Sequence, residues 1–296
     1  MTMNSLSQSD AGQTLPKLGI LAGSGPLPRK LVELCHQTGR PVFVMAFDGH
    51  TDQETVEGVD HAWSRLGAAG TVIKTLKANA VQEMVMIGPI KRPSVKELRP
   101  DWRAMQVLAR AGMKSLGDDT LLRGVIDTLE EEGFLFRGVD DFLQDLLMPS
   151  GPLGEFGIDD PETVSDVRRG VEVARALGAV DVGQSVVVQD GLVLAVEGIE
   201  GTDALILRSR ELKREGRGAV LVKLKKPEQD RRADLPTVGL TTLANAVASG
   251  FRGIALEAGG SLLVDREQVV RKANEAGVFV CGIHPSDFME EQETEQ

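Results

Sequence analysis

The chain has 296 residues, of which 42% are hydrophobic and 26% charged, a composition typical of globular proteins and unlike that of disordered chains. Its formal net charge of −11 opposes non-specific attraction to nucleic acid, and the lack of Tyr leaves few aromatic side chains for stacking on bases. These features exclude a nucleic-acid-binding protein as the leading interpretation.

The first 16 residues are polar and lack the basic start and apolar core of a signal peptide, so we expect a disordered or vector-derived tail. Apolar runs elsewhere are far shorter than the roughly 20 residues that span a bilayer. The two cysteines, Cys35 and Cys281, show no CxxC spacing and are expected to be reduced and buried. We therefore expect a cytoplasmic protein.

Apolar and amphipathic segments alternate through the first half of the chain. Strands are expected at 18–22, 41–46, 61–66, 83–90 and 134–139, and helices at 27–36, at 71–77 and within 101–132. Such alternation is typical of an α/β fold with a mainly parallel sheet. We predict an N-terminal Rossmann-like domain at 17–148.

The first strand is followed by a glycine-containing turn with the sequence AGSGPLP, residues 22–28. Its glycines would let a ligand approach the backbone, and the next helix start would offer N–H groups to a phosphate. The third glycine of a dinucleotide fingerprint is missing, and a tight turn without a ligand is the alternative. The predicted substrate contacts are Gly23, Ser24, Gly25 and Leu27.

Two further groups of charged residues in the first half are candidate substrate contacts. Lys91 and Arg92 directly follow a predicted strand and could pair with phosphates, although a solvated charge pair is the alternative. Asp118 and Asp119 begin a predicted helix; N-terminal capping is one interpretation, and contact with a metal or sugar is the other.

Residues 149–160 are rich in Pro and Gly and form the predicted linker, followed by a separate C-terminal α/β domain at 161–285 and an acidic tail at 286–296. Asp190-Gly191 lies between two β-rich runs within 185–196, which predicts a hairpin. Strands are also expected at 219–224, 253–256 and 278–282. Helices are expected at 161–177, 203–214, 241–248 and 266–276.

Between the hairpin and the next helix, residues 197–203 read EGIEGTD and contain three carboxylates. Glu197 and Glu200 are candidate ligands of Mg²⁺ or another divalent cation, because such ions are held by one or two carboxylates plus substrate phosphates. Thr202 and Asp203 are candidate substrate contacts. A turn followed by a helix N-cap is the alternative.

The densest group of charges lies in the loop after the predicted 219–224 strand, which reads KLKKPEQDRRADLPTVG from 223 to 239. Cations can stabilise the charge that develops on phosphate oxygens, while a carboxylate binds metal or positions water. We predict catalytic roles for Lys223, Asp230, Arg232 and Asp234, and the two aspartates are also candidate metal ligands. A salt-bridged structural loop is the alternative.

These motifs together resemble the LpxI family, the UDP-2,3-diacylglucosamine pyrophosphatases of Gram-negative lipid A biosynthesis. The resemblance is carried by AGSGPLP, GPIKRP, GDDTLLR, LAVEGIEGTDALI and LVKLKKPEQDRRADLPTVG, and it extends from about 17 to 283. It implies two α/β domains with the glycolipid held between them. It also implies Mg²⁺-dependent hydrolysis to UMP and 2,3-diacylglucosamine 1-phosphate, known as lipid X.

An aspartate of the family's QDxRxDLP motif is essential for turnover, and the resemblance assigns this role first to Asp230 and second to Asp234. Gln229 matches the first motif position and is a candidate substrate contact. We hypothesise that Mg²⁺ bridges the pyrophosphate and one or both aspartates. Lys223 and Arg232 would then neutralise phosphate oxygens, with no covalent enzyme intermediate.

The two acyl chains of such a substrate require an apolar chamber or a membrane contact, because burying each CH₂ is worth about 0.8 kcal/mol. Segments 102–116 and 142–148 are candidates, with ordinary core packing as the alternative. Peripheral contact with the inner membrane is therefore a further hypothesis. The competing functions are a non-catalytic nucleotide-sugar binding module, a nicotinamide-dependent oxidoreductase and a structural scaffold; the sequence predicts no oligomeric state.

Overall fold

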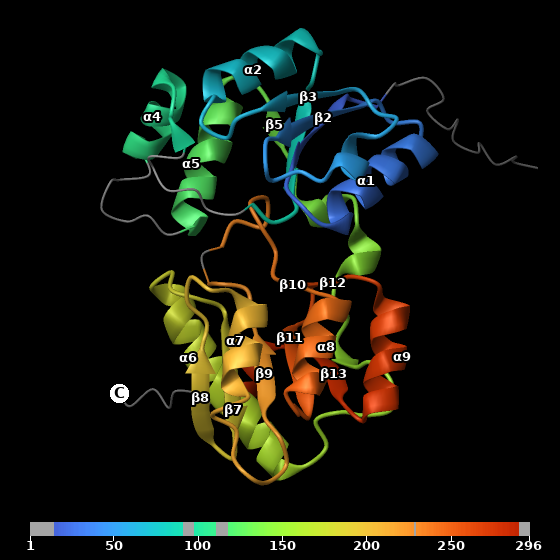
Figure 1. Ribbon diagram of the computed structural model, residues 1–296, viewed down its shortest axis with the longest axis vertical. Coiled ribbons are helices and arrows are strands. Elements are labelled where there is room, and N and C mark those ends of the chain that lie inside the picture. The colour runs from blue at the N-terminus through green and yellow to red at the C-terminus, as the bar shows by residue number, and fades with distance from the viewer. Residues whose placement is uncertain (1–14, 91–97, 111–117, 228, 290–296) are drawn as a thin grey trace, which may run out of the picture. The chain divides into compact units, whose positions relative to one another are not determined.

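The computed structural model describes residues 15–90, 98–110, 118–227 and 229–289. The chain divides into two compact units, which are described separately. Unit 1 comprises Met1–Ala109 and Ile126–Arg137, and unit 2 comprises Arg110–Val125 and Gly138–Gln296. Each unit contains its own β-sheet, so the predicted two-domain α/β architecture is confirmed (Figure 1).

Unit 1 is built on a five-stranded parallel sheet with the order β3-β2-β1-β4-β5. Its strands are β1 (Leu18–Ala22), β2 (Val42–Phe47), β3 (His61–Ser64), β4 (Glu83–Ile87) and β5 (Leu135–Phe136). Its helical elements are α1 (Pro26–Gln37), η1 (Gln53–Val56), α2 (Ala69–Ala78), α4 (Trp102–Arg110) and α5 (Asp118–Glu131), of which α4 and α5 extend into residues assigned to unit 2. Every residue of β1 and β2 is buried, as expected for central parallel strands covered on both faces. This order and direction confirm the predicted Rossmann-like domain.

Unit 2 contains a six-stranded mixed sheet with the order β6-β13-β11-β9-β7-β8 and a small parallel pair, β10-β12. Its strands are β6 (Gly151–Pro152), β7 (Ser185–Gln189), β8 (Leu192–Val196), β9 (Val220–Lys223), β10 (Thr237–Val238), β11 (Gly253–Glu257), β12 (Leu262–Leu263) and β13 (Phe279–Ile283). Strands β9, β11 and β13 are parallel, whereas β6 and β7 run antiparallel to their neighbours.

The helices of unit 2 are α6 (Pro161–Ala179), α7 (Thr202–Ser209), α8 (Leu240–Ala248) and α9 (Arg266–Ala276); its short 3-10 turns are η2 (Val139–Asp141), η3 (Gln144–Leu146) and η4 (Pro285–Phe288). The predicted hairpin is confirmed as β7 and β8. Asp190 and Gly191 both have positive φ, 51° and 77°, which suits a two-residue hairpin turn.

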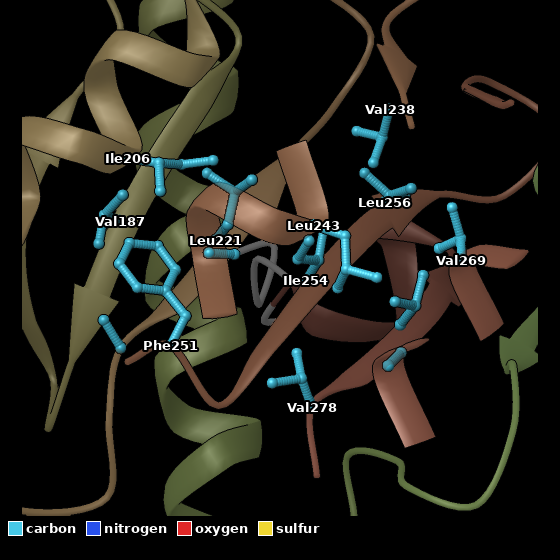
Figure 2. Close-up of a cluster of buried hydrophobic side chains, with 14 of the residues drawn as sticks. Val187, Ile206, Leu221, Val238, Leu243, Phe251, Ile254, Leu256, Val269 and Val278 are labelled. Carbon is cyan, nitrogen blue, oxygen red and sulfur yellow. The ribbon is translucent and has the colours of Figure 1, made fainter. Parts of the chain in front are cut away.

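Alternate residues of the central strands of unit 2 enter two different cores. Val187 and Leu221 join the cluster that packs against α7, α8 and α9, which is shown in Figure 2. Val188 and Val222 instead face the cluster that contains Val167 and other residues of α6. Because side chains alternate along a strand, this sheet is covered by helices on both faces. The loops at the edges of this sheet therefore start from strands that are buried on both faces.

Two details of organisation differ from the predicted layout. The chain crosses from unit 1 to unit 2 at residues 137–138, before the predicted linker at 149–160. Met148 is 1% exposed within the core of unit 2, and β6, which lies inside the predicted linker, pairs with β13. These contacts explain why the segment after residue 137 belongs to unit 2. Both cysteines are free and buried, as predicted.

Candidate functional site

The carboxyl ends of β9 and β11 lie side by side at one edge of the six-stranded sheet. Lys223, the last residue of β9, is a register partner of Leu256 in β11 and of Ser185, the first residue of β7. Loops after adjacent parallel strands of an open α/β sheet are the usual location of ligand sites. The predicted Lys223–Gly239 loop begins at this edge.

Lys223 is buried, with 6% of its surface exposed, and its ammonium donates a 2.8 Å hydrogen bond to the hydroxyl of Thr202 at the start of α7. The Thr202 hydroxyl donates a 2.7 Å bond to Oε1 of Glu197. The hydroxyl of Ser185 lies 3.2 Å from the same Thr202 oxygen. Four polar side chains from three elements and a loop therefore form one buried cluster.

The carboxylates of Glu197 and Glu200 both have partners within unit 2. Glu197 accepts hydrogen bonds from Thr202 and, at 3.1 Å, from the backbone N–H of Gln184. Backbone N–H groups of its own loop and the guanidinium of Arg208, 2.8 Å away, lower the pKa of Glu200. The two glutamates point to different partners, which does not favour a metal site that they share.

Asp230 and Arg232 are paired within the loop that follows β9. Arg232 donates to Asp230 from its backbone N–H at 2.9 Å, from Nε at 3.0 Å and from its terminal amino group at 2.7 Å. The Arg232 guanidinium lowers the pKa of Asp230, and Arg123 of α5 adds to this effect. Asp230 is therefore an ionised carboxylate at neutral pH.

Neighbouring residues fix the conformation of this loop. The side chain of Gln229 is buried and accepts a 3.2 Å bond from the backbone N–H of Lys226. Arg231 binds the carboxylate of Asp140 at 2.7 Å and the carbonyl of Gly259 at 3.0 Å. Asp234 is exposed, and its backbone N–H lies 3.4 Å from the carbonyl oxygen of Asp230. Asp230 and Asp234 thus differ in environment.

In unit 1, the AGSGPLP turn is held by its own neighbours. The backbone N–H of Gly23 binds the carbonyl of Ile87 at 2.8 Å, and a Cβ at this position would lie 2.2 Å from the carbonyl oxygen of Gly88. The Ser24 hydroxyl donates to the carbonyl of Pro89 at 3.1 Å. The close packing of the loops that follow β1 and β4 therefore accounts for the residue types at Gly23 and Ser24.

The start of α1 already has an anionic partner within unit 1. The N–H of Gly25 donates a 2.6 Å hydrogen bond to the carboxylate of Asp52. Because Pro26 and Pro28 have no N–H, Leu27 supplies the remaining donor in the first three helical positions. Contact of Gly25 and Leu27 with a substrate stays a prediction, with few donors left for a phosphate.

Several predicted site residues fall outside the described structure. Lys91 and Arg92 lie outside the described residues. The backbone of Asp118 and Asp119 begins α5, but their side chains are not described. Asp203 follows Thr202 in α7, and its Oδ1 atom is buried without a hydrogen-bond partner. Asp203 therefore stays a candidate contact next to the Lys223 cluster.

Within the part of the chain that is described, the side chains do not form a metal site made of protein ligands alone. There, no three His, Cys, Asp or Glu side chains lie close enough together to hold a metal ion. Both oxygens of Asp230 are bonded to Arg232, and both oxygens of Glu197 have partners. The predicted set of four metal ligands does not fit as one site.

The structure adds residues that sequence reasoning did not select. Asp140 and Gly259 anchor the loop through Arg231, and Glu257 accepts a 2.9 Å bond from the backbone N–H of Lys225. Glu257 could have been selected from the sequence, because it directly follows the predicted 253–256 strand. Asp140 is 91 residues from its partner and had no comparable signal.

The two segments considered for acyl chains differ in exposure. On α4, Trp102 is 77% exposed and Met105 is 48% exposed, whereas Met148 is buried in the core of unit 2. The rest of the first segment, 111–116, lies outside the described residues. None of the described helices is long and apolar enough to cross a bilayer.

Comparison with known proteins gives matches over nearly the whole chain. A family model described as LpxI N-terminal domain matches residues 17–146, and one described as LpxI C-terminal domain matches residues 150–281. The UDP-2,3-diacylglucosamine pyrophosphatase LpxI of Caulobacter vibrioides is 38% identical over 278 residues. The match covers 92% of this chain and 99% of that relative.

Two solved structures show weak similarity to this chain. N5-carboxyaminoimidazole synthase of Aspergillus clavatus is 16% identical with a TM-score of 0.23, over 68% of this chain and 44% of that chain. The biotin carboxylase domain of 2-oxoglutarate carboxylase from Hydrogenobacter thermophilus is 11% identical with a TM-score of 0.26, over 68% and 42%. Neither similarity carries an argument about this protein.

Proposed function

The chain belongs to the LpxI family, and on this premise we propose that it is a UDP-2,3-diacylglucosamine pyrophosphatase of lipid A biosynthesis. The products are UMP and 2,3-diacylglucosamine 1-phosphate, lipid X. The observation that carries the proposal is the match of both family domains together with 38% identity over 92% of the chain. The same match disfavours a nicotinamide-dependent oxidoreductase.

The charge distribution at the edge of the six-stranded sheet supports hydrolysis of a phosphoanhydride. Lys223 and Arg232 would stabilise charge on the non-bridging oxygens, and UMP would leave without a covalent intermediate. The lowered pKa of Asp230 makes this carboxylate a weak base, because a general base is most effective when its pKa is near the working pH. Asp230 therefore acts in its ionised form, orienting the attacking water or a cation.

Metal dependence is part of the proposal, with Mg²⁺ as the expected ion. Since the described side chains do not form a protein-only site, the pyrophosphate itself would supply most of its ligands, with Asp230 as the protein carboxylate. When bound, Mg²⁺ would neutralise charge on the phosphate oxygens. Asp234 would then remain a second candidate carboxylate.

The lipid part of the substrate leads to a proposal about membranes. We propose that the protein works in the cytoplasm in peripheral contact with the inner membrane. The exposed Trp102 and Met105 on α4 support this proposal, because amphipathic helices carrying Trp can bury an apolar face at a bilayer interface. Flotation of active protein with liposomes of anionic lipid tests it; activity that stays entirely in the liposome-free fraction contradicts it.

The test of the proposed function is release of UMP from UDP-2,3-diacylglucosamine by wild type and Asp230→Ala, each with Mg²⁺ and with EDTA. We expect wild type to release UMP with Mg²⁺ and to stop in EDTA, and Asp230→Ala to bind substrate without turnover. A wild-type protein that binds the nucleotide sugar but releases no UMP would be a binding module. Unchanged turnover in Asp230→Ala would remove this residue from the mechanism.

A further inference from the structure

The ammonium of Lys223 is buried but only partly bonded. An ammonium has three N–H donors, and among the described residues Thr202 is the one hydrogen-bond acceptor of Lys223 Nζ. Lys223 is buried, with 6% of the residue surface exposed. A buried charge is costly unless it is paired, so the two remaining donors mark a place where an anion would be stabilised.

One orientation of the Thr202 hydroxyl proton satisfies all three of its neighbours. Its single proton goes to the Glu197 carboxylate at 2.7 Å, which cannot donate when ionised. Both lone pairs are then free to accept, one from Lys223 at 2.8 Å and the other from the Ser185 hydroxyl at 3.2 Å. Glu197 therefore sets the orientation of Thr202, and Thr202 sets the position of the ammonium.

The cluster lies at a helix start that has no cap of its own. Thr202 is the first residue of α7, and no side chain caps this helix. The N–H groups of its first turn, from Thr202, Asp203 and Ala204, have no partner within the helix. Such groups attract anions, and the Lys223 ammonium is held at the same helix start through the Thr202 side chain.

Placing a hydroxyl between the carboxylate and the ammonium has a chemical consequence. A direct ion pair between Glu197 and Lys223 would occupy the ammonium with a carboxylate. With Thr202 between them, the carboxylate fixes the geometry while two N–H donors of Lys223 stay available to a ligand. Glu197 is itself fixed by the backbone N–H of Gln184.

We infer that Glu197 and Thr202 are positioning residues that hold the Lys223 ammonium against a phosphate oxyanion of the substrate at the start of α7. This inference rests on the proposed function and gives Glu197 a role other than metal ligation. The ligand class is a phosphate ester or anhydride.

The test compares Thr202→Val, Thr202→Ser and Glu197→Gln with wild type in the UMP-release assay. Thr202→Val keeps the shape but removes the hydroxyl, and we expect kcat/KM to fall about 10- to 100-fold, as for loss of a partner that orients a functional group. Thr202→Ser keeps the hydroxyl and should restore most of the activity. Inhibition by inorganic phosphate should weaken in Thr202→Val and in Glu197→Gln.

Asp166→Asn is the matched control for Glu197→Gln. Asp166 is also a buried carboxylate of unit 2, but it bonds the backbone N–H groups of Asp190 and Gly191 in the hairpin turn. Both variants should lower the melting temperature. Only Glu197→Gln should lower kcat/KM below that temperature, and excess Mg²⁺ should not restore it.

The outcomes separate this inference from the proposed function. If wild type releases no UMP, the proposed function fails. If wild type is active and Thr202→Val or Glu197→Gln keeps wild-type kinetics and phosphate inhibition, the positioning role is wrong. Rescue of Glu197→Gln by excess Mg²⁺ would also overturn it, because that result indicates a metal ligand.

Discussion

The starts of α1 and α7 have nearly the same backbone but different surroundings. Each helix is preceded by a glycine in a conformation that favours glycine, Gly25 with φ 83° and ψ −179° and Gly201 with φ 82° and ψ 170°. The N–H of Gly25 is bonded to Asp52, and two prolines remove further donors from α1. At α7 the donors are present, and Lys223 adds a positive charge.

The N-terminus of α6 is capped in a third way. Its own N-cap residue, Asp160, accepts hydrogen bonds from the backbone N–H of Thr163 at 2.9 Å and from the Thr163 hydroxyl at 2.7 Å. Thus α6 is capped by its own N-cap residue, and α1 by Asp52, which lies 27 residues after Gly25. No side chain caps α7. A glycine turn before a helix is therefore weak evidence of a ligand until its neighbours are known.

The largest effect should come from removing the charge at α7. Lys223→Met keeps a long side chain in the buried position but removes the ammonium that we infer binds the phosphate. We expect kcat/KM for UMP release to fall about 100- to 1000-fold, as when one preorganised electrostatic contact to a transition state is lost. A fall of less than threefold would place the phosphate elsewhere.

Alanine at the two glycines tests whether the helix starts differ in function. A Cβ at either Gly25 or Gly201 would meet no atom within 4 Å, so backbone strain is the shared effect. Each variant should lose about 1–3 kcal/mol of stability in chemical denaturation. Only Gly201→Ala should also reduce kcat/KM, because it shifts Thr202 and the bonded Lys223.

The opposite result for the two glycine variants would contradict this assignment. If Gly25→Ala reduces turnover at a temperature where it is fully folded and Gly201→Ala does not, the AGSGPLP turn binds the reacting part of the substrate. A rise in KM alone for Gly25→Ala would support the predicted uridine contact there.

Asp52→Ala tests whether the carboxylate at α1 is structural. Removing an acceptor from a helix N-terminus costs about 0.5–2 kcal/mol, so the melting temperature should fall. Turnover of the folded variant should match wild type. Unchanged stability would mean that the 2.6 Å contact with Gly25 contributes nothing measurable.

The smallest effect concerns pH and the capped start of α6. Hydrogen bonds from Thr163 and the charge of Arg252 hold the pKa of Asp160 well below its usual range. A lowered pKa stabilises the fold fully above the unfolded value of about 3.9, and this stabilisation is lost as the pH falls through that value toward the folded pKa. The difference in melting temperature between wild type and Asp160→Asn should therefore shrink below about pH 4. A constant difference would contradict this assignment.

Much of the fold could be predicted because long apolar runs and Gly or Pro at their ends determine it. The segments 18–22, 185–196 and 253–256 gave strands near their predicted limits. Strands β6, β10 and β12 have two residues each and show no periodicity that a sequence pattern could reveal.

The candidate site was harder to predict because its contacts join distant parts of the chain. The resemblance to a family supplied the QDxRxDLP motif, and the pairing of Asp230 with Arg232 is local. In contrast, Lys223 meets Thr202 across 21 residues and Arg231 meets Asp140 across 91. Glu197 was predicted as a metal ligand because composition alone did not reveal that a threonine separates it from the ammonium.

Substrate binding without turnover tests the central difference between α1 and α7 most directly. In the Asp230→Ala background, the dissociation constant of UDP-2,3-diacylglucosamine would be measured with Lys223→Met or Asp52→Ala added. We expect Lys223→Met to weaken binding about tenfold or more, equal to about 1.4 kcal/mol, and Asp52→Ala to leave it unchanged. Weaker binding with Asp52→Ala and unchanged binding with Lys223→Met would contradict the assignment of the phosphate to the start of α7.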